Sequence, residues 1–128
     1  METVTIPEGN QAVMPYLMLH NAAKFNEFTQ TVFGAKQIGD LHLQPDGSIM
    51  HGEIMINGST IMFCDVKDPW QPSPASLFVY VASADESYAK ALAEGATSLM
   101  GLSDQNYGRT CGITDPVGNV WWITNVIK

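Results

Sequence analysis

Apolar residues recur with helical spacing in two segments of the chain. In "NAAKFNEFTQTVFG" they follow the three- and four-residue spacing of an amphipathic helix, with Asn21 placed as N-cap and Gly34 just beyond the last turn. In "SADESYAKALAEG" the same pattern begins at Ser83, which with Glu86 forms a capping box, and ends at Gly95. The sequence therefore predicts one amphipathic helix in each segment.

Strand-like runs surround both predicted helices in the same order. "YLMLH" precedes the first helix and "LFVYV" the second, and "KQIGDLHL", "IMHGEIMI" and "STIMFCDV" follow the first, separated by the pairs Asp46-Gly47 and Asn57-Gly58 that favour two-residue hairpins. Corresponding positions lie about sixty residues apart, as Gly58 and Gly118 do. We therefore predict a single α+β domain over 1–128, made of two βαβββ modules at about 13–66 and about 76–126, joined by the Pro-rich linker 67–75.

Composition and charge exclude several classes of function. The 128 residues suffice for one packed domain, and 45% hydrophobic content argues against disorder. A net charge of -7, with no Lys/Arg cluster, excludes the electrostatic footprint of a nucleic-acid-binding protein. The start lacks the pattern of a signal peptide and no apolar run could cross a membrane, so we expect a cytoplasmic protein without a membrane partner. Cys64 and Cys111 fall inside strand-like runs and are expected to be buried free thiols.

The stretch "DPVGNVWWI" shows that both faces of the predicted sheets need cover. Successive side chains of a strand point to opposite faces, so Trp121 and Trp122 cannot share one core. Period-two sorting places Trp121 on the face that the helices cover, together with Leu17, Leu19, Ile54, Ile56, Ile61, Phe63, Leu77, Val79, Val81 and Ile123.

The opposite face has a different composition. It is aromatic, rich in methionine and sparsely polar, and it receives Met14, Tyr16, Met18, His51, Glu53, Met55, Met62, Cys64, Ser76, Phe78, Tyr80, Trp122 and Thr124. Such a surface is too apolar to face water freely, yet it carries polar groups that a sealed core would have to pair. It fits the wall of a small-molecule pocket. Packing of this face against a partner subunit is the alternative.

Two modules of this length resemble the vicinal oxygen chelate superfamily, which includes glyoxalase I, bleomycin-resistance proteins and extradiol dioxygenases. The strings "PYLMLHNAAKFNEFTQTVFGA", "PDGSIMHGEI" and "DQNYGRTCGITDPVGNVWWI" resemble the PhnB-like branch of that superfamily. The resemblance implies curled sheets around a ligand cavity, frequently completed across a homodimer.

The resemblance also implies where a metal would be bound. Metal-dependent members take His and Glu ligands from the first and last strands of each module, and these positions fall near Met14, Met62, Ser76 and Trp122. Thioether, hydroxyl and indole groups are poor replacements, so we expect no such metal. Some relatives have a methyltransferase-like description, but this chain lacks a glycine-rich turn for a nucleotide, and we expect no cofactor.

Three side chains carry the candidate polar chemistry. His51 and Glu53 stand two apart on one strand and match an "MHxE" string of PhnB-like proteins, so they could bind a metal, act as acid and base, or orient a ligand through a hydrogen-bonded pair. Arg109 could pair with an anionic group of a ligand or bridge to a surface acid. The expected ligand-binding set is Tyr16, His51, Glu53, Met62, Ser76, Phe78, Tyr80, Arg109 and Trp122.

These observations predict a homodimeric protein that binds a small apolar or partly aromatic molecule without the usual metal. The first alternative is a metal-dependent lyase, isomerase or dioxygenase that uses His51 and Glu53 and one further ligand. The second is a dimeric interaction module whose second face is filled by its partner. The sequence names neither the ligand nor a reaction.

Overall fold

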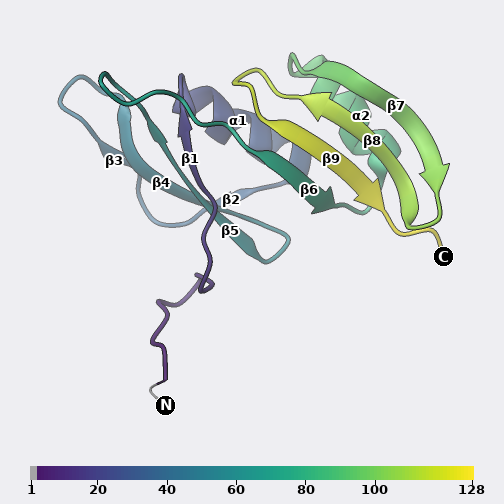
Figure 1. Cartoon of the computed structure of the whole chain (residues 1–128), viewed down its shortest axis with the longest axis horizontal. Coiled ribbons are helices and arrows are strands. Elements are labelled where there is room, and N and C mark those ends of the chain that lie inside the picture. The colour runs from purple at the N-terminus through teal and green to yellow at the C-terminus, as the bar shows by residue number, and fades with distance from the viewer. Residues whose placement is uncertain (1–2) are drawn as a thin grey trace.

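The computed structural model describes residues 3–128, which fold into two βαβββ-type modules lying side by side (Figure 1). This confirms the α+β class and the repeat. Along the chain the elements are β1 (Tyr16–Leu19), α1 (Ala22–Phe33), β2 (Lys36–Gln37), β3 (His42–Leu43), β4 (Ile49–Ile56), β5 (Ser59–Asp65), β6 (Ser76–Tyr80), α2 (Ala84–Ala93), β7 (Thr97–Gln105), β8 (Gly108–Thr114) and β9 (Val120–Asn125).

Each module forms its own sheet with the same connectivity. In the first sheet β1 pairs in parallel with β5, β5 pairs antiparallel with β4, and both β2 and β3 pair with β4. In the second sheet β6 pairs in parallel with β9, and β8 and β7 follow in antiparallel order. The register sets Tyr16 opposite Met62 and Phe78 opposite Trp122, so the parallel strand pairs β1–β5 and β6–β9 correspond to each other.

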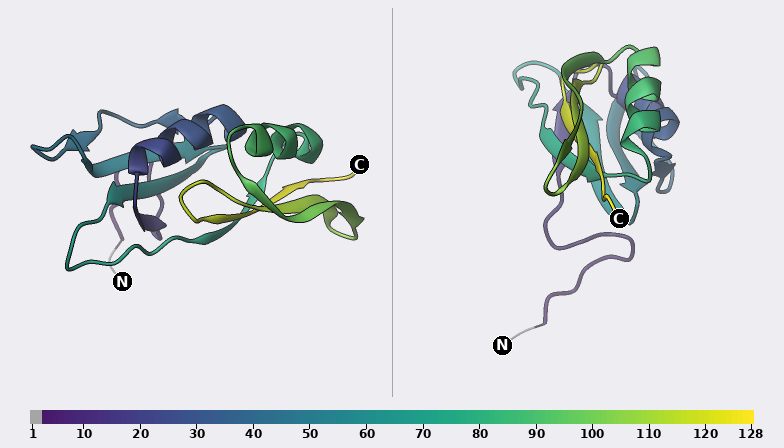
Figure 2. Two further views of the ribbon diagram at one scale, coloured as in Figure 1. Left: turned by 90° about the horizontal axis from the view of Figure 1, so that it is seen from above. Right: turned by 90° about the vertical axis from the view of Figure 1, so that its right-hand side faces the viewer.

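Both helices lie on the same side of the two sheets, as the left view of Figure 2 shows. Between helices and sheets lies one continuous core, whose aromatic centre joins the two modules. Trp121 of β9 packs against two rings of α1, with centroids 4.7 Å from Phe33 and 6.4 Å from Phe25. Phe25 in turn packs against Phe63 of β5 at 5.2 Å. In the described part of the chain, no helix covers the opposite side of either sheet.

The helix ends follow the sequence prediction. The side chain of Asn21 accepts a hydrogen bond from Lys24 N, and that of Ser83 accepts one from Glu86 N. Gly34 ends α1 in the left-handed conformation with φ of 66°, which a residue without Cβ adopts without strain. Within residues 3–128, neither helix is long and apolar enough to cross a membrane.

Two local expectations need correction. The segment "KQIGDLHL" is not one strand, because Gly39 has φ of 66° and turns the chain between the short strands β2 and β3. Asn57-Gly58 forms the expected two-residue hairpin between β4 and β5, with positive φ at both residues. Asp46-Gly47, in contrast, lies inside a longer connection over 44–48.

Candidate functional site

The uncovered sides of the two sheets carry the side chains that alternation predicted for them. Every predicted helix-facing residue of the two central strands β5 and β9 is buried, including Trp121 at 1% exposure, whereas Met62 and Trp122 between them are partly exposed. Cys64 and Thr124 also lie on the uncovered side but are buried. They are small and stand in register beside the larger Met18 and Tyr80, which shield them.

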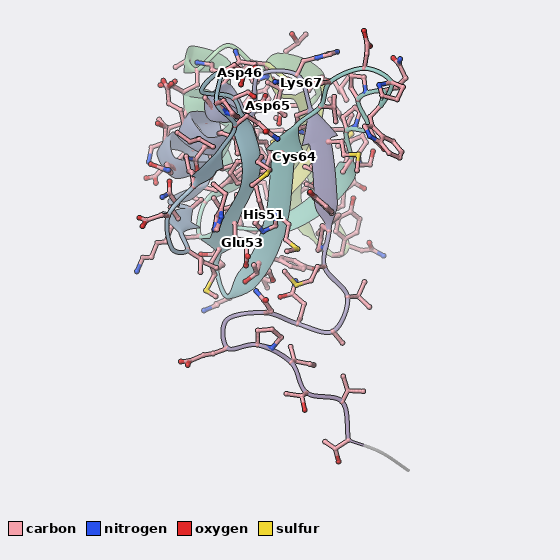
Figure 3. The ribbon with its side chains drawn as sticks, turned by 90° about the vertical axis from the view of Figure 1, so that its left-hand side faces the viewer. Asp46, His51, Glu53, Cys64, Asp65 and Lys67 are labelled. Carbon is pink, nitrogen blue, oxygen red and sulfur yellow. The ribbon has the colours of Figure 1, made fainter. Side chains whose placement is uncertain are left out.

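The first uncovered surface, here called the module-one face, consists of Tyr16, Met18, His51, Glu53, Met62 and Cys64 on β1, β4 and β5. His51 and Glu53 point toward one another on β4, as Figure 3 shows, with 3.1 Å between His51 Nε2 and Glu53 Oε2. In register, Met62 lies between Glu53 and Tyr16, and Tyr16 packs edge-on against His51 with ring centroids 5.9 Å apart. The structure therefore brings Tyr16, His51, Glu53 and Met62 together.

A segment before β1 completes the polar end of the module-one face. Asn10 Nδ2 donates a hydrogen bond of 2.9 Å to Glu53 Oε1, so both carboxylate oxygens of Glu53 have partners. These bonds, with that from Asn10 the stronger influence and that from His51 next, hold the pKa of Glu53 below its ordinary value of 4.5. Glu53 is therefore an anion at neutral pH.

The same segment is fastened to the start of β5. The Gln11 side chain donates to the Thr60 carbonyl at 2.8 Å and accepts from Thr60 N at 3.4 Å, and the Thr60 hydroxyl donates to the carbonyl of Gly9. Sequence reasoning assigned no role to Asn10 or Gln11. Both are polar residues in an irregular stretch, and no periodic signal marks their partners, which lie more than forty positions away along the chain.

A hollow of about 280 Å³ adjoins the module-one face near the start of the linker. Its walls include Tyr16, Met18, Cys64 and Trp70, and the Trp70 side chain is 68% exposed. Lys67 lines the same hollow, but its ammonium group is paired with the Asp46 carboxylate. Burial raises the pKa of the Tyr16 hydroxyl, so this residue presents a neutral phenol.

The second uncovered surface, here called the module-two face, is formed by aromatic side chains of β6 and β9 and of the β7–β8 turn. Phe78 lies 5.3 Å from Tyr80 and 6.1 Å from Tyr107 between ring centroids. Trp122 stands beside Phe78 in register and lies over Gly112, where an added Cβ would come within 2.4 Å of its ring. Gly112 thus provides the space that the indole occupies.

Beside the module-two face, a second hollow of about 420 Å³ lies between β6 and the start of β5. Phe78 and Tyr80 line it from one side, and Val13, Pro15 and Thr60 line it from the other. Ser76, at the beginning of β6, is exposed but does not line this hollow.

Arg109 is not brought together with the other predicted residues. It stands on β8 in register with Asn125, on the side that α2 covers. Its guanidinium makes a two-pronged ion pair with Asp85, at 3.0 and 3.1 Å, and a further bond of 2.9 Å to Asp104. Of the two roles considered for Arg109, the structure shows the bridge to surface acids.

The residues at the inherited metal positions do not fit a metal ion. Met62 and Trp122 offer a thioether and an indole, neither of which is a good ligand for a hard divalent ion, and the Met14 sulfur accepts a hydrogen bond from Gln11 N at 3.4 Å. Across residues 3–128 no group of three or more His, Cys, Asp or Glu side chains is arranged to hold a metal.

Comparison with known proteins agrees with this architecture. The uncharacterized protein Mb0911c of Mycobacterium bovis is 31% identical over 91% of this chain and 84% of its own length. Two solved structures with similar folds are the PhnB protein from Bacillus cereus, at a TM-score of 0.69 with 18% identity over 91% of this chain and 100% of that one, and the antibiotic-binding protein TnmS3 from Streptomyces sp. CB03234, at 0.68 with 18% identity over 92% and 100%.

The family relationship follows from a match over most of the chain. The model of one family, spanning the repeat from the first strand to the last, matches residues 16–123. This match extends over both modules and the linker between them. The chain belongs to the Glyoxalase/Bleomycin resistance protein/Dioxygenase superfamily.

Proposed function

We propose that this protein binds a small apolar or partly aromatic molecule, and that it does so without the metal ion of the superfamily's metal-dependent members. The observation that carries the proposal is the gathering of aromatic rings on the module-two face. Phe78 and Tyr80 are 50% and 55% exposed, and across residues 3–128 both helices lie on the other side of the sheets (Figure 2). Exposed aromatic clusters of this kind mark places where a ligand or a partner is bound.

The polar groups of the uncovered faces support a ligand in preference to a sealed core. They are few, and those of the module-one face are gathered at Glu53, where His51 and Asn10 hold the carboxylate in a fixed position. Binding sites commonly combine apolar walls with a small number of positioned polar groups that set the orientation of the ligand. The antibiotic-binding protein TnmS3 shows that a protein of similar fold can bind a small organic molecule.

We further propose that two copies of the chain associate, and that together they shield the uncovered faces and a ligand bound there from water. Each sheet of one copy has one side without a helix, and half-exposed aromatic residues there favour association. Light scattering at micromolar concentration should then report about twice the chain mass of 14.0 kDa. A single species at the mass of one chain would contradict the dimer.

Ligand binding is tested with a neutral aromatic probe such as naphthylmethanol, followed by quenching of tryptophan fluorescence. Phe78→Ala should weaken binding by about fivefold or more, because it removes an aromatic contact worth about 1 kcal/mol or more. Leu92→Ala is the matched control, since Leu92 is an exposed apolar side chain on α2, on the other side of the molecule. Absence of saturable binding up to millimolar probe, or equal losses in both variants, would refute the proposal.

Elemental analysis of untagged protein separates this proposal from metal-dependent catalysis. We expect substoichiometric Zn, Ni, Fe and Mn, because the inherited positions lack suitable donors. Close to one metal ion per chain, lost in His51→Ala, would favour a lyase, isomerase or dioxygenase that uses His51 and Glu53.

A further inference from the structure

We infer that the module-one face binds an organic cation that also carries an aromatic or apolar ring, and that Glu53 selects the charge of this ligand. This inference rests on the proposed function and adds the chemical class of the ligand. Glu53 lies on the uncovered side of the sheet with its side chain 23% exposed, so it is accessible to a ligand but largely removed from bulk water. A carboxylate in such a place attracts a cation more strongly than one on the open surface.

Glu53 is ionised and held by neutral or weakly basic groups. The hydrogen bonds from Asn10 and His51 keep its pKa low, and Asn10 contributes no charge. Each carboxylate oxygen has only one such partner, and an oxygen of this kind can accept a second hydrogen bond. The carboxylate is therefore held in position by two hydrogen bonds, and its oxygens can still accept a further hydrogen bond from an ammonium group.

The lysines and arginine nearest the uncovered faces do not neutralise this carboxylate. Within residues 3–128, no lysine or arginine forms an ion pair with Glu53. Lys67, which lines the adjoining hollow, is paired with Asp46, and Arg109 is occupied on the other side of its sheet. Lys36 of β2 stands in register with Met55, two residues along β4 from Glu53, and is not among the ion-pair partners of Glu53 in the described residues. Among the described residues, the titratable group paired with Glu53 is thus a histidine, His51, and not a lysine or arginine, in a chain whose net charge is -7.

An aromatic wall stands at a suitable distance from the charge. Tyr16, Met62 and Glu53 lie in register on three adjacent strands, so two strand spacings, about 10 Å, separate the backbones of Tyr16 and Glu53. The Tyr16 side chain is 47% exposed and presents a neutral phenol ring. An alkylamine that carries an aromatic ring fits this arrangement, because its ammonium group meets Glu53 while Tyr16 and Met62 contact its ring. A carboxylate or phosphate ligand would be repelled.

The test uses three probes that share one naphthalene ring system and differ in charge: naphthylmethylammonium, naphthylmethanol and naphthylacetate. Affinities are measured by titration calorimetry at pH 8 on the full chain, with wild type, Glu53→Gln and Glu86→Gln. Glu86→Gln removes the same charge from α2, where the side chain is exposed, and serves as the matched control. Gln keeps the size of Glu53 and can still accept a hydrogen bond from Asn10.

In wild type we expect the cation to bind about fivefold or more tightly than the neutral probe, and the anion to bind most weakly. Glu53→Gln should bring cation and neutral probe to equal affinity, whereas Glu86→Gln should leave their ratio unchanged. The wild type alone gives a second measurement, because raising the salt concentration should weaken binding of the cation and leave that of the neutral probe almost unaltered.

The outcomes distinguish the two proposals. If all three probes fail to bind wild type, both the proposed function and the cation preference are wrong. If probes bind but the anion equals or exceeds the cation, or if the ratio in wild type is insensitive to salt, only the cation preference is wrong. An unchanged ratio in a folded Glu53→Gln variant would likewise show that Glu53 does not select charge.

Discussion

The adjacent residues Trp121 and Trp122 allow a direct comparison of the covered and uncovered sides of one strand. Trp121→Ala removes a side chain that is 1% exposed and packs against Phe33 and Phe25 of α1. It also removes the indole N–H that donates to Asp115 Oδ2 at 2.8 Å. We expect a loss of about 3–5 kcal/mol in the free energy of unfolding, a large part of the roughly 5–15 kcal/mol of a small domain.

Trp122→Ala should cost much less, about 1–2 kcal/mol, because the Trp122 side chain is partly exposed already and lies at the surface over Gly112. This variant should remain folded but lose much of the fluorescence quenching caused by a bound aromatic probe. Both variants are compared by urea unfolding followed by far-UV circular dichroism at one protein concentration. If Trp122→Ala is the more destabilising change, the covered and uncovered sides have been assigned in reverse.

Three further predictions concern single residues. Gly112→Ala should cost about 1–3 kcal/mol and displace the Trp122 ring, because the new Cβ would lie 2.4 Å from a ring carbon; unchanged stability and probe binding would contradict this. Burial raises the pKa of Cys111 to about 11, so its thiol should stay unreactive toward a maleimide at pH 8 until urea unfolds the chain. The pKa of Glu53 is lowered from its ordinary value of 4.5, so the ionised carboxylate stabilises the fold above that pH and this stabilisation is lost as the pH falls through the folded-state pKa. The stability advantage over Glu53→Gln should therefore shrink as the pH is lowered below 4.5, and a constant difference would exclude this coupling.

Most of the fold was predictable because local rules agree with the tertiary structure. The caps at Asn21 and Ser83 lie where the sequence places them, since a side-chain oxygen before an amphipathic pattern satisfies free backbone N–H groups in almost any context. The two-residue period of β5 and β9 survives because one side of each strand is buried by a helix, which fixes the register. Short polar stretches such as the one around Gly39 lack this constraint, and there the predicted strand is broken.

The polar contacts of the candidate site were less predictable, because they join segments far apart in sequence. The bond from Asn10 to Glu53 depends on how the chain before β1 crosses the sheet, and no local pattern encodes that path. The position of Arg109, in contrast, was available from alternation. Cys111 and Ile113 face the helices, and counting back two residues from Cys111 places Arg109 on the same side. Its pairing with Asp85 required the three-dimensional structure.

Equivalent positions of the two modules carry different residues on the uncovered side of the sheets. Met62 and Trp122 occupy equivalent positions in the two modules, and their antiparallel neighbours are Glu53 and Gly112. On the covered side both modules keep apolar residues, because each helix must be packed against its sheet whatever the ligand. On the uncovered side, module one has the ionised carboxylate of Glu53 at the position where module two has Gly112, which lies beneath the Trp122 ring. Packing of each helix against its sheet does not require this difference, which accords with the proposed role of the uncovered sides in ligand binding.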